Sequence, residues 1–438
     1  MKVTFGSLKE YTRSRISTKS TREAILGALS LMKADPMDME VRFIITDLLI
    51  STGRKDLLAP FLTSSAELAV VSGHGACAFS FTAMLRDLGF DVQPAIEQIA
   101  DFYSSESNVI SEYGTRTAPL PSDSAVDGPE DLPNTDEDIL NNIVTFSADR
   151  TSWSELPEKL LPMPLLSDLD TNSFLTITKG YRLNRLKKGD FVIREGEPGN
   201  SFFICALGSL DVFKSDTYGR QSHLASLHDG AIFGEMALVQ LAPRSASVAS
   251  TGFAEVIEFH ASNLSEMAGE LPIVAKALDK FTRDRLITNL MNNSAFFKPF
   301  SRKQRKDLLR HFQAYVVDTD TVILREGDEG TGLYLVLSGE VDIIKDLHGQ
   351  NEVKVATLGA TESFGEISLI TENPTSASCV AARRTTLLFL ARHYFTRLIQ
   401  SVPELKTYFE MLSLNRIAET KSLLEEIENE EEEEFILI

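Results

Sequence analysis

The sequence predicts an α+β protein of several domains, in which an N-terminal all-α helical domain is followed by two tandem β jelly rolls with flanking helices. Two observations predict this fold class. Apolar residues recur at helical spacing up to residue 104, whereas short β-rich runs broken by glycine dominate beyond residue 160. Within the second region the same residues recur at a constant offset. A chain of 438 residues has room for about two to four domains.

The N-terminal region, residues 1–104, is predicted to be a helical domain. Ser20 and Glu23 have the spacing of a capping box, and an apolar helical pattern follows them. The stretch that ends at Gly53 resembles a tetratricopeptide-type unit, and Gly53 recurs as Gly89 after another apolar helix. Two weak copies do not establish a repeat array, so an all-helical domain of another topology stays open.

Residues 105–159 are predicted to be an acidic, proline-containing linker. Between positions 118 and 138 the sequence carries seven acidic residues and no basic residue, and four of its positions from 119 to 133 are proline. Such a segment buries little apolar surface, so we expect a disordered or extended conformation.

Residues 160–290 and 291–415 are predicted to be two copies of one β domain. Short strand-like runs and tight glycine turns in both copies favour a barrel or jelly roll. Every matched pair is 131 residues apart, as Gly196 and Gly327 are, which means that the loops of the two copies have equal lengths. Each copy ends in an amphipathic helix. Residues 416–438 are expected to be a helix end and an acidic tail, with eight glutamates between positions 425 and 434.

One string of residues in the first copy has the chemistry of a ligand site. From Phe233 to Val248 it reads Phe-Gly-Glu-Met-Ala-Leu-Val-Gln-Leu-Ala-Pro-Arg-Ser-Ala-Ser-Val. Gly234 allows close approach to the backbone, and the amides that begin a short helix after it attract an anion. Arg244 adds a permanently charged fork for two phosphate oxygens. Glu235 would repel the phosphate unless it accepted a hydrogen bond from the same ligand, and phosphate beside a ribose 2′-hydroxyl describes a 3′,5′-cyclic nucleotide.

This string resembles the phosphate-binding cassette of cyclic-nucleotide-binding domains, with the pattern Phe-Gly-Glu-x-Ala-Leu and then Pro-Arg-x-Ala. The resemblance covers about residues 160 to 415 and includes the glycine turn 195–199. It implies an eight-stranded jelly roll in which Glu235 binds the ribose, Arg244 binds the cyclic phosphate and Asp211 orients Arg244. The predicted ligand-binding residues are Gly234, Glu235, Met236, Ala237, Arg244, Ser245, Ala246 and Asp211.

The second copy departs from the pattern at its charged position, where Thr375 stands in place of the arginine. Loss of a charged hydrogen-bonding partner costs about 1.5–3 kcal/mol, so the affinity should fall about 10-fold to 100-fold. We therefore expect this copy to bind cyclic nucleotide weakly or not at all, with Glu366 and Asp342 left without a countercharge. If it does bind a ligand, the candidate residues are Gly365, Glu366, Ser368, Thr375 and Ser376.

These features predict a cyclic nucleotide sensor that binds its ligand in the first copy and then changes its interdomain or partner contacts. Ser245 does not decide the base, and cyclic AMP is favoured over cyclic GMP; Phe281 and Leu286 are candidates to cover the base. The layout is similar to that of the regulatory subunit of cyclic-AMP-dependent protein kinase, although Arg116 and Arg150 are single where that family's inhibitory linker has paired basic residues. The alternatives are a non-catalytic scaffold with vestigial pockets and an inhibitor of the regulatory-subunit type.

Other classes of protein are disfavoured. The net charge is −20 and no basic helix-turn-helix follows either copy, so we expect no nucleic-acid binding. The sequence has no nucleophile elbow, Walker loop, kinase triad or metal-ligand spacing, so we expect neither catalysis nor a metal. Three scattered cysteines and the lack of a long apolar run predict a cytoplasmic protein without membrane insertion. A protein partner would bind through the helical N-terminus or the C-terminal tail, the latter by strand addition.

Overall fold

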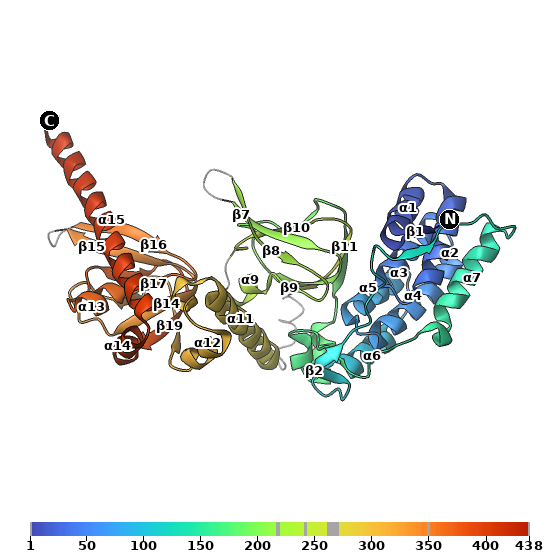
Figure 1. Ribbon diagram of the computed structural model, residues 1–438, viewed down its shortest axis with the longest axis horizontal. Helices are drawn as coiled ribbons and strands as arrows, with labels where there is room; N and C mark the ends of the chain where they lie inside the picture. Colours follow the sequence, from blue (N-terminus) through green and yellow to red (C-terminus); the bar gives the residue numbers. More distant parts are fainter. Residues whose placement is uncertain (1, 216–219, 241–242, 261–270, 348–350, 437–438) are drawn as a thin grey trace. The chain divides into compact units, whose positions relative to one another are not determined.

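The computed structural model describes residues 2–215, 220–240, 243–260, 271–347 and 351–436. The chain divides into two compact units, Met1–Thr282 and Arg283–Ile438. The first unit holds a helical region and a β domain, and the second unit holds another β domain with its own helices (Figure 1). The predicted fold class is therefore confirmed.

The N-terminal region is helical, as predicted. Its helices are α1 (Phe5–Ser17), α2 (Thr21–Ala34), α3 (Met39–Ser51), α4 (Lys55–Val71), α5 (Gly75–Asp87) and α6 (Gln93–Tyr103). The predicted capping box at the start of α2 is wrong, because Ser20 makes no side-chain capping bond and Glu23 instead pairs with Arg15 at 2.9 Å. The tetratricopeptide-like interpretation of these helices stays a prediction.

The segment 105–159 is folded, so the expectation of a disordered or extended linker is wrong. It contains β2 (Ile110–Thr115), β3 (Ala125–Asp127), α7 (Asp136–Ala148) and the short 3-10 helix η1 (Arg150–Ser152). Strand β3 pairs antiparallel with β1 (Lys2–Thr4) at the start of the chain. Helix α7 packs on α2 and α4 and buries an apolar face of Ile139, Leu140, Ile143 and Val144.

The acidic residues in the first turn of α7 have a structural role that the composition of the segment does not reveal. Thr135 caps the helix and forms a reciprocal capping box with Asp138. Asp136 and Glu137 lie in the same first turn, where the positive end of the helix dipole favours negative charge. Part of the acidic run that predicted a linker therefore forms the N-terminal turn of a packed helix.

The β domain of the first unit begins with η2 (Leu166–Asp168) and α8 (Thr171–Ile177). Its strands form two antiparallel four-stranded sheets, in the orders β4-β11-β6-β9 and β5-β10-β7-β8. Their bounds are β4 Arg182–Leu186, β5 Phe191–Ile193, β6 Ser201–Leu207, β7 Leu210–Ser215, β8 Gln221–Leu227, β9 Ile232–Phe233, β10 Ser247–Ser250 and β11 Ala254–His260. The short helix α9 (Glu235–Gln240) joins β9 to β10, and α11 (Leu271–Asn293) crosses the boundary between the units.

The second unit repeats this arrangement, with sheets in the orders β12-β19-β14-β17 and β13-β18-β15-β16. Its strands are β12 Gln313–Val317, β13 Val322–Leu324, β14 Gly332–Ser338, β15 Val341–Leu347, β16 Asn351–Leu358, β17 Ser363–Phe364, β18 Ser378–Ala381 and β19 Thr385–Ala391. Its further helices are η3 Ala295–Phe297, α12 Arg302–Leu309, α13 Glu366–Thr371, α14 Arg392–Ser401 and α15 Pro403–Ile436. Strand β12 begins 131 residues after β4, as the repeat in the sequence predicts.

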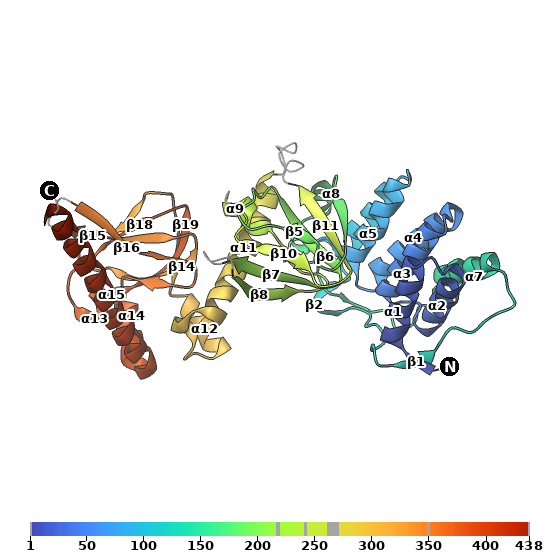
Figure 2. The same ribbon diagram turned by 90° about the horizontal axis from the view of Figure 1, so that it is seen from above.

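Within the first unit, the helical region and the β domain share one hydrophobic core. Helix α5 packs on β6 and β11 (Figure 2). The Cys77 thiol donates to the carbonyl oxygen of Ala206 at 3.1 Å, and the hydroxyls of Thr82 and Tyr181 are 2.6 Å apart. These buried contacts hold the helices against the sheet that carries β6.

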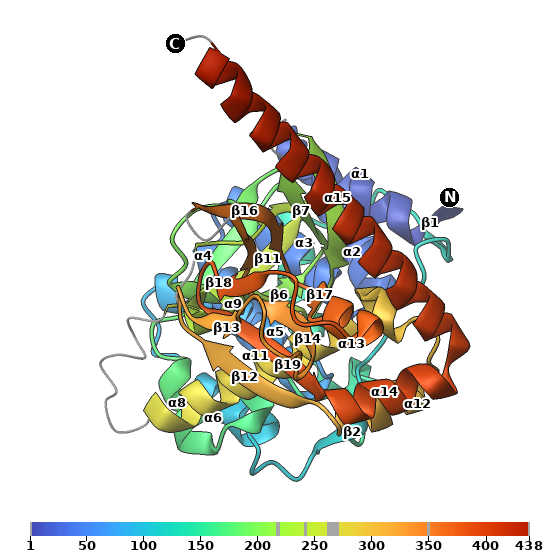
Figure 3. The ribbon, with the colours of Figure 1, turned by 90° about the vertical axis from the view of Figure 1, so that its left-hand side faces the viewer.

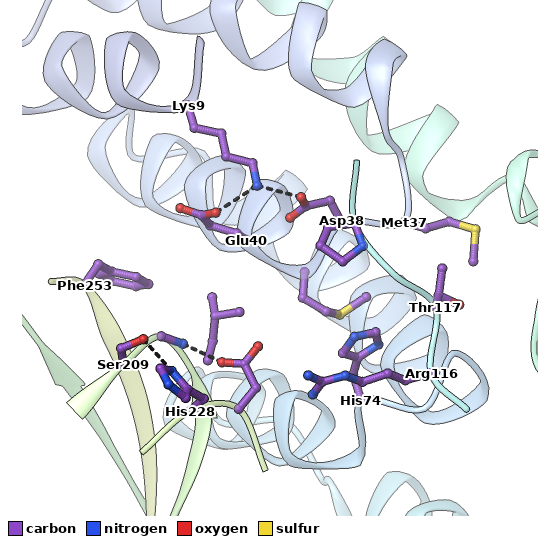
Figure 4. Close-up of a pocket in the computed structure, with 15 residues that line it drawn as sticks. Lys9, Met37, Asp38, Glu40, His74, Arg116, Thr117, Ser209, His228 and Phe253 are labelled. Atoms are coloured by element: carbon purple, nitrogen blue, oxygen red, sulfur yellow. Dashed lines mark hydrogen bonds and ion pairs between the residues drawn. The ribbon is translucent and has the colours of Figure 1, made fainter. Parts of the chain in front are cut away.

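Polar groups complete the same seam. A cavity of about 410 Å³ lies there, and across it Lys9 pairs with Asp38 at 2.6 Å and with Glu40 at 2.8 Å (Figure 4). His74 and Arg116 line another part of this cavity. Burial lowers the pKa of His74 to about 4, with a further contribution from the charge of Arg116, so this imidazole is neutral at physiological pH.

Helix α15 continues through the glutamate run to Ile436, so the acidic tail predicted after residue 416 is helical as far as the structure describes it. Figure 3 shows α15 as the long helix of the second unit, and it packs against α13 and α14. Leu437 and Ile438, half of the apolar end predicted to bind a partner by strand addition, lie outside the described residues. Of the helices that the structure describes, none has both the length and the apolar composition to span a bilayer.

Candidate functional site

The predicted cassette of the first unit lies between β9 and β10 and includes α9. Gly234 has a φ of 81°, a backbone conformation that residues other than glycine rarely adopt. A Cβ at Gly234 would also lie only 2.9 Å from Nη1 of Arg244. Both the backbone conformation and the closeness of the arginine therefore require glycine at this position.

Arg244 is buried and held by three neighbouring groups. Its side chain donates from Nη1 to the carbonyl oxygen of Gly234 at 2.6 Å and from Nη2 to Oγ of Ser201 at 3.1 Å. The guanidinium also lies 5.5 Å from the ring centre of Phe203. The residue is 7% exposed. The Arg244 guanidinium, which the sequence predicts to bind a phosphate, thus donates a hydrogen bond to the backbone of the cassette itself.

Burial lowers the pKa of the Arg244 guanidinium from its ordinary value, and the negative charges of Glu258, Glu235 and Glu197 oppose that change. Arginine titrates far above physiological pH, so the group keeps its charge. The carboxylates around it supply the electrostatic support that a buried cation needs.

The backbone around Arg244 is tied to the glycine turn that precedes β6. The amide of Arg244 donates to the carbonyl of Glu197 at 2.8 Å, and the amide of Gly196 donates to the carbonyl of Arg244 at 2.9 Å. A Cβ at Gly199 would meet Ala237 Cβ at 2.2 Å and Arg244 Cζ at 3.1 Å. Gly199 therefore lets α9 and the arginine approach this turn.

The other predicted ligand residues of the first cassette lie on α9 and on the loop before β10. Glu235 begins α9 and is 1% exposed, and Ala237 is also buried. Met236 and Ala246 are half-buried, whereas Ser245 is exposed. The structure thus brings Gly234, Glu235, Ala237 and Arg244 together, in agreement with the spacing in the sequence.

Asp211 has different partners from the one that the resemblance implies. Oδ1 of Asp211 accepts a hydrogen bond from Oγ of Ser226 at 2.7 Å and lies 3.3 Å from Nε2 of His223. The bond from Ser226 is the main cause that lowers the pKa of Asp211 below its ordinary value. Since Arg244 donates to Gly234 and Ser201 instead, the structure does not join Asp211 to the arginine that it was predicted to orient.

The second cassette keeps the same backbone frame. Gly365 has a φ of 85°, close to that of its counterpart in the first cassette. The amide of Thr375 donates to the carbonyl of Asp328 at 2.9 Å, and the amide of Gly327 donates to the carbonyl of Thr375 at 2.9 Å. These are the two backbone bonds of Arg244, shifted by one repeat. The substitution of threonine for arginine has therefore left the fold of the cassette intact.

The hydroxyl of Thr375 is used within the protein. It donates to the carbonyl oxygen of Arg325 and lies 3.1 Å from that of Asp328, and the residue is 5% exposed. Ser368, another candidate, donates from Oγ to the carbonyl of Gly365 at 3.1 Å. Ser376 is exposed. None of these groups brings the positive charge that the first cassette has in Arg244.

The prediction that Glu366 and Asp342 lack a countercharge is wrong. Oε1 of Glu366 pairs with Nη1 of Arg416 at 2.7 Å, and Asp342 pairs with Lys354 at 3.5 Å. Arg416 lies on α15, 50 residues after the carboxylate in the sequence, and its Nη1 also donates to the carbonyl of Ser363 at 2.6 Å. The sequence analysis did not identify Arg416 as a partner of Glu366. The one indication in the sequence is that Arg416 is an arginine in the helix that ends the second repeat.

A cavity of about 590 Å³ lies between the second cassette and α15. Its walls include Glu366 and Thr375 from the cassette and Arg416, Ile417 and Leu424 from the helix. Burial raises the pKa of Glu366 above its ordinary value, while the charge of Arg416 lowers it. Small-molecule sites usually measure about 300–1,000 Å³, so the volume suits a ligand of nucleotide size or smaller.

No metal centre accompanies these pockets in the part of the chain that the structure describes, where no group of three or more histidine, cysteine or acidic side chains is placed to hold an ion. The prediction that the protein works without a metal stays a prediction.

Comparison with known protein families matches both β domains. The model of the cyclic nucleotide-binding domain matches residues 183–270 and again residues 316–402. These two ranges contain the two cassettes described above. The family describes a ligand-binding domain, and the expectation that the whole chain is not an enzyme stays a prediction.

Relatives of the chain include a cGMP-dependent protein kinase and regulatory subunits of cAMP-dependent protein kinase. Mouse cGMP-dependent protein kinase 2 is 26% identical over 257 residues, which are 57% of this chain and 32% of the kinase. The cAMP-dependent protein kinase type II regulatory subunit of Drosophila melanogaster is 24% identical over 268 residues, which are 61% of this chain and 67% of that subunit. The chain thus spans about a third of the kinase and about two thirds of the regulatory subunit.

Among solved structures, the regulatory domain of Toxoplasma gondii PKA with cAMP is 24% identical, and the match covers 57% of this chain and 92% of that one. Its TM-score of 0.28 is too low to support an argument from the superposition. The family match and the repeated cassettes carry the assignment instead. The chain therefore carries two cyclic nucleotide-binding domains in tandem, one in each unit, behind an N-terminal helical region.

Proposed function

We propose that the protein is a cyclic nucleotide-responsive regulator whose first domain binds the ligand and whose second domain does not bind cyclic nucleotides strongly. The observation that carries this proposal is Arg244, which is present, buried and adjacent to Gly234 and Glu235 in a domain of this family. The second domain has Thr375 at the equivalent position.

The chemistry of binding follows from the bonds that Arg244 already makes. Its Nη1 and Nη2 donate to neutral acceptors, the carbonyl of Gly234 and the hydroxyl of Ser201. A phosphate oxygen is a stronger acceptor because a charge-assisted bond forms with it. The cyclic phosphate would therefore compete for the guanidinium, while Glu235 would accept a hydrogen bond from the ribose 2′-hydroxyl. Met236, Ala237, Ser245 and Ala246 would contribute backbone contacts around the phosphate.

Cyclic AMP is the proposed ligand in preference to cyclic GMP. The Drosophila relative is named for cAMP and the mouse relative for cGMP, so the relatives allow both. Ser245 does not separate the two bases. Competition between the two cyclic nucleotides for the first site tests this choice.

Control of a protein kinase is a second candidate function, which the similarity to regulatory subunits favours. In this role a kinase would be the protein partner, held through the helical N-terminus or the C-terminal tail, and the ligand would change that contact. The experiment is to mix the full chain with a catalytic subunit of cAMP-dependent protein kinase and measure phosphorylation of a peptide with and without cyclic AMP. Inhibition that cyclic AMP relieves supports the candidate, and unchanged kinase activity contradicts it.

The proposed ligand site has its own test. Isothermal titration of the full chain with cyclic AMP should give one binding site, and Arg244→Ala should lose at least about tenfold in affinity, which corresponds to about 1.4 kcal/mol. Arg220→Ala, which removes an arginine immediately before β8 in the same domain, is the matched control and should bind as the unchanged protein does. Equal affinity of Arg244→Ala and the unchanged protein would remove the basis of the proposal.

A further inference from the structure

Helix α12 carries a concentrated positive charge in a chain whose net charge is −20. Between positions 298 and 310 the sequence has six basic residues and one acid. One of the six, Arg305, holds the helix in place by donating to the carbonyl oxygens of Phe300 at 2.8 Å and Met291 at 2.5 Å. The other five are exposed, and we call them the α12 patch: Lys298, Arg302, Lys303, Lys306 and Arg310.

The charges of the α12 patch are poorly compensated within the domain. Arg310 pairs with Asp307 at 3.7 Å, but both side chains are largely exposed. In the part of the chain that the structure describes, no acid pairs with Arg302, Lys303 or Lys306. Arg302 and Lys303 also begin α12, where the helix dipole disfavours cations, and Arg302 lies one turn from Lys306, so their like charges repel. The α12 patch is therefore stabilised by an anionic partner.

The exposed surface beside the α12 patch continues onto α14. The ring of His311, which follows the patch in the sequence, lies 4.7 Å from the ring of Tyr394 on α14. His393, Tyr394 and Arg397 are exposed on α14, and Arg397 adds a further cation to this surface. The positive charge thus extends over two helices, which suits an extended anionic segment better than a single small anion.

The same chain has a matching acidic segment in the last part of α15. Eight glutamates lie between positions 425 and 434, which we call the glutamate run, and no basic residue follows Lys421. Glu425 pairs with Lys421 at 3.5 Å, and both Glu425 and Glu426 are exposed. Figure 1 shows this end of α15 projecting beyond the strands of the second domain. The like charges of the glutamate run repel one another along the helix, so the run is stabilised by a cationic partner.

The glutamate run does not reach the α12 patch of its own chain. The ring centre of Phe296 lies 5.8 Å from that of Phe312, just after α12, and 6.1 Å from that of Phe409 on α15. The start of α15 therefore lies near α12 (Figure 3). From Phe409 the helix rises about 24 Å to Glu425 and about 38 Å to Glu434, at about 1.5 Å per residue. Opposite charges thus lie near the two ends of one helix, too far apart to meet.

We propose that the glutamate run of one copy docks on the α12 patch of a second copy, and that the second copy's run docks on the patch of the first. A helix with opposite charges near its two ends is self-complementary when two copies lie antiparallel, and a two-fold axis makes the two contacts identical. Met411 and Leu414 lie on α15 between the charged segments and are 55% and 63% exposed, so they add apolar contact area along the pair.

A second copy is favoured over another polyanion because every chain supplies one glutamate run for each α12 patch. The net charge of −20 opposes association only at long range. At about 0.15 M salt the Debye length is about 8 Å, so the charges of remote parts are screened, whereas ion pairs in contact are screened much less. Dimerisation of this kind does not depend on cyclic nucleotide binding in the first domain.

The first test is the mass of the full chain by sedimentation equilibrium over about 1 to 100 μM protein, in about 0.15 M and about 1 M salt. One chain has a mass of 48.5 kDa. We expect a species of twice that mass at the lower salt and a monomer at the higher salt, because salt weakens exposed ion pairs. A monomer at the lower salt overturns the proposal, including the case in which heparin or anionic vesicles bind the α12 patch instead.

Charge reversal tests each half of the contact. The patch variant replaces three exposed cations with acids: Arg302→Glu, Lys303→Glu and Lys306→Glu. The run variant replaces three acids with cations: Glu430→Lys, Glu433→Lys and Glu434→Lys. Each variant alone should dimerise at least about tenfold more weakly than the unchanged protein. An equal mixture of the two should dimerise again, because the reversed patch then meets the reversed run and the two unchanged segments meet each other.

A control variant reverses three exposed cations of the first domain: Arg182→Glu, Lys187→Glu and Lys188→Glu. It should dimerise as the unchanged protein does, and circular dichroism should give the same helix content for all variants. Undiminished dimerisation of the patch variant, an equal loss in the control variant, or a mixture that stays monomeric overturns the proposal.

Cross-linking gives a second readout, which locates the contact. The three native cysteines are buried, so a bismaleimide reacts with introduced cysteines in preference. Lys303→Cys combined with Glu433→Cys should give a covalent dimer on a denaturing gel, whereas Lys187→Cys combined with Glu433→Cys should not. Equal yields of covalent dimer from the two pairs would contradict the placement of the glutamate run on the α12 patch.

Discussion

Arg416 reaches from α15 to the cassette of the second domain and pairs with Glu366 at 2.7 Å. The carboxylate is 1% exposed and the arginine side chain is 21% exposed, so water screens this pair only in part. The same guanidinium also donates to the carbonyl of Ser363. The Arg416 side chain therefore connects α15 both to β17, through Ser363, and to α13, through Glu366.

Removal of this arginine should destabilise the second unit. Arg416→Ala leaves a buried carboxylate without its partner, which costs about 3–5 kcal/mol when the pair is fully buried and less when it is partly exposed. We expect a loss of about 3 kcal/mol in the free energy of unfolding, measured by urea denaturation of the full chain. The control is Lys421→Ala, which breaks the exposed pair with Glu425 on the same helix and should cost less than about 1 kcal/mol. Equal losses in the free energy of unfolding for the two variants would show that the pair of Arg416 with Glu366 stabilises the protein no more than an exposed ion pair does.

The ion pair at the seam of the first unit predicts a pH dependence. Arg185 pairs with Glu255 at 2.8 Å and with Asp47 at 2.8 Å, and Glu255 is fully buried. Burial raises the pKa of Glu255 to about 7, against the lowering effect of Arg185. The folded state then holds a proton more tightly than the unfolded state, so this contribution to stability is present below about pH 4.5 and is lost as the pH rises through about 7.

The measurement is the free energy of unfolding of the full chain from urea titrations at pH 5 and pH 7.5. Glu255→Gln removes the titrating group, so the unchanged protein should lose more stability over this interval than the variant does. Glu258→Gln, on the same strand β11, is the control and should keep the slope of the unchanged protein. If the free energy of unfolding of Glu255→Gln falls between pH 5 and pH 7.5 as much as that of the unchanged protein, another group causes the pH dependence.

Gly199 predicts how closely the first cassette is packed. An added methyl group at this position would lie 2.2 Å from Ala237 Cβ and 3.1 Å from Arg244 Cζ. Gly199→Ala should therefore displace α9 or the arginine, at a cost of about 1–3 kcal/mol, and should weaken cyclic AMP binding. Gly252→Ala is a matched control because its Cβ would meet no atom within 4 Å. Calorimetry should show a loss for Gly199→Ala alone, and wild-type affinity in that variant would contradict this account of the turn.

Thr375→Arg tests whether the missing positive charge alone accounts for the difference in cyclic AMP affinity that we expect between the two cassettes. The backbone at this position makes the same two hydrogen bonds as the backbone of Arg244, so an arginine has a matching frame. In an Arg244→Ala background, this substitution should raise cyclic AMP affinity of the second domain about 10-fold to 100-fold. Thr371→Arg, at the exposed end of α13, adds the same charge outside the cavity and should not. No gain from Thr375→Arg would show that the second cassette differs by more than its charge.

The repeat and the cassettes could be predicted from the sequence because they depend on local spacing. A constant offset of 131 residues requires equal loops, and the strands of the two domains follow that offset, as β4 and β12 do. The contact between Gly234 and Arg244 joins residues only ten positions apart, so a short string of residues specifies it. The first cassette was therefore read from sixteen consecutive residues.

Features that depend on distant residues were not predicted. The partner of Glu366 lies 50 residues away on a helix, and its position follows only from the packing of α15. Asp211 bonds to Ser226 across the β7–β8 pair rather than to Arg244, which no spacing in the chain reveals. Helix α7 lies in a segment whose acidic composition resembles that of a linker, although Ile139 and Ile143 have the i, i+4 spacing of an apolar helix face.

A calorimetric titration of cyclic AMP into the full chain and into Arg244→Ala tests most directly whether Arg244 forms the ligand site. We expect one strong site per unchanged chain and a loss of at least about tenfold in affinity when the arginine is removed. Two equivalent strong sites, or a chain that binds cyclic AMP equally well without Arg244, would contradict it.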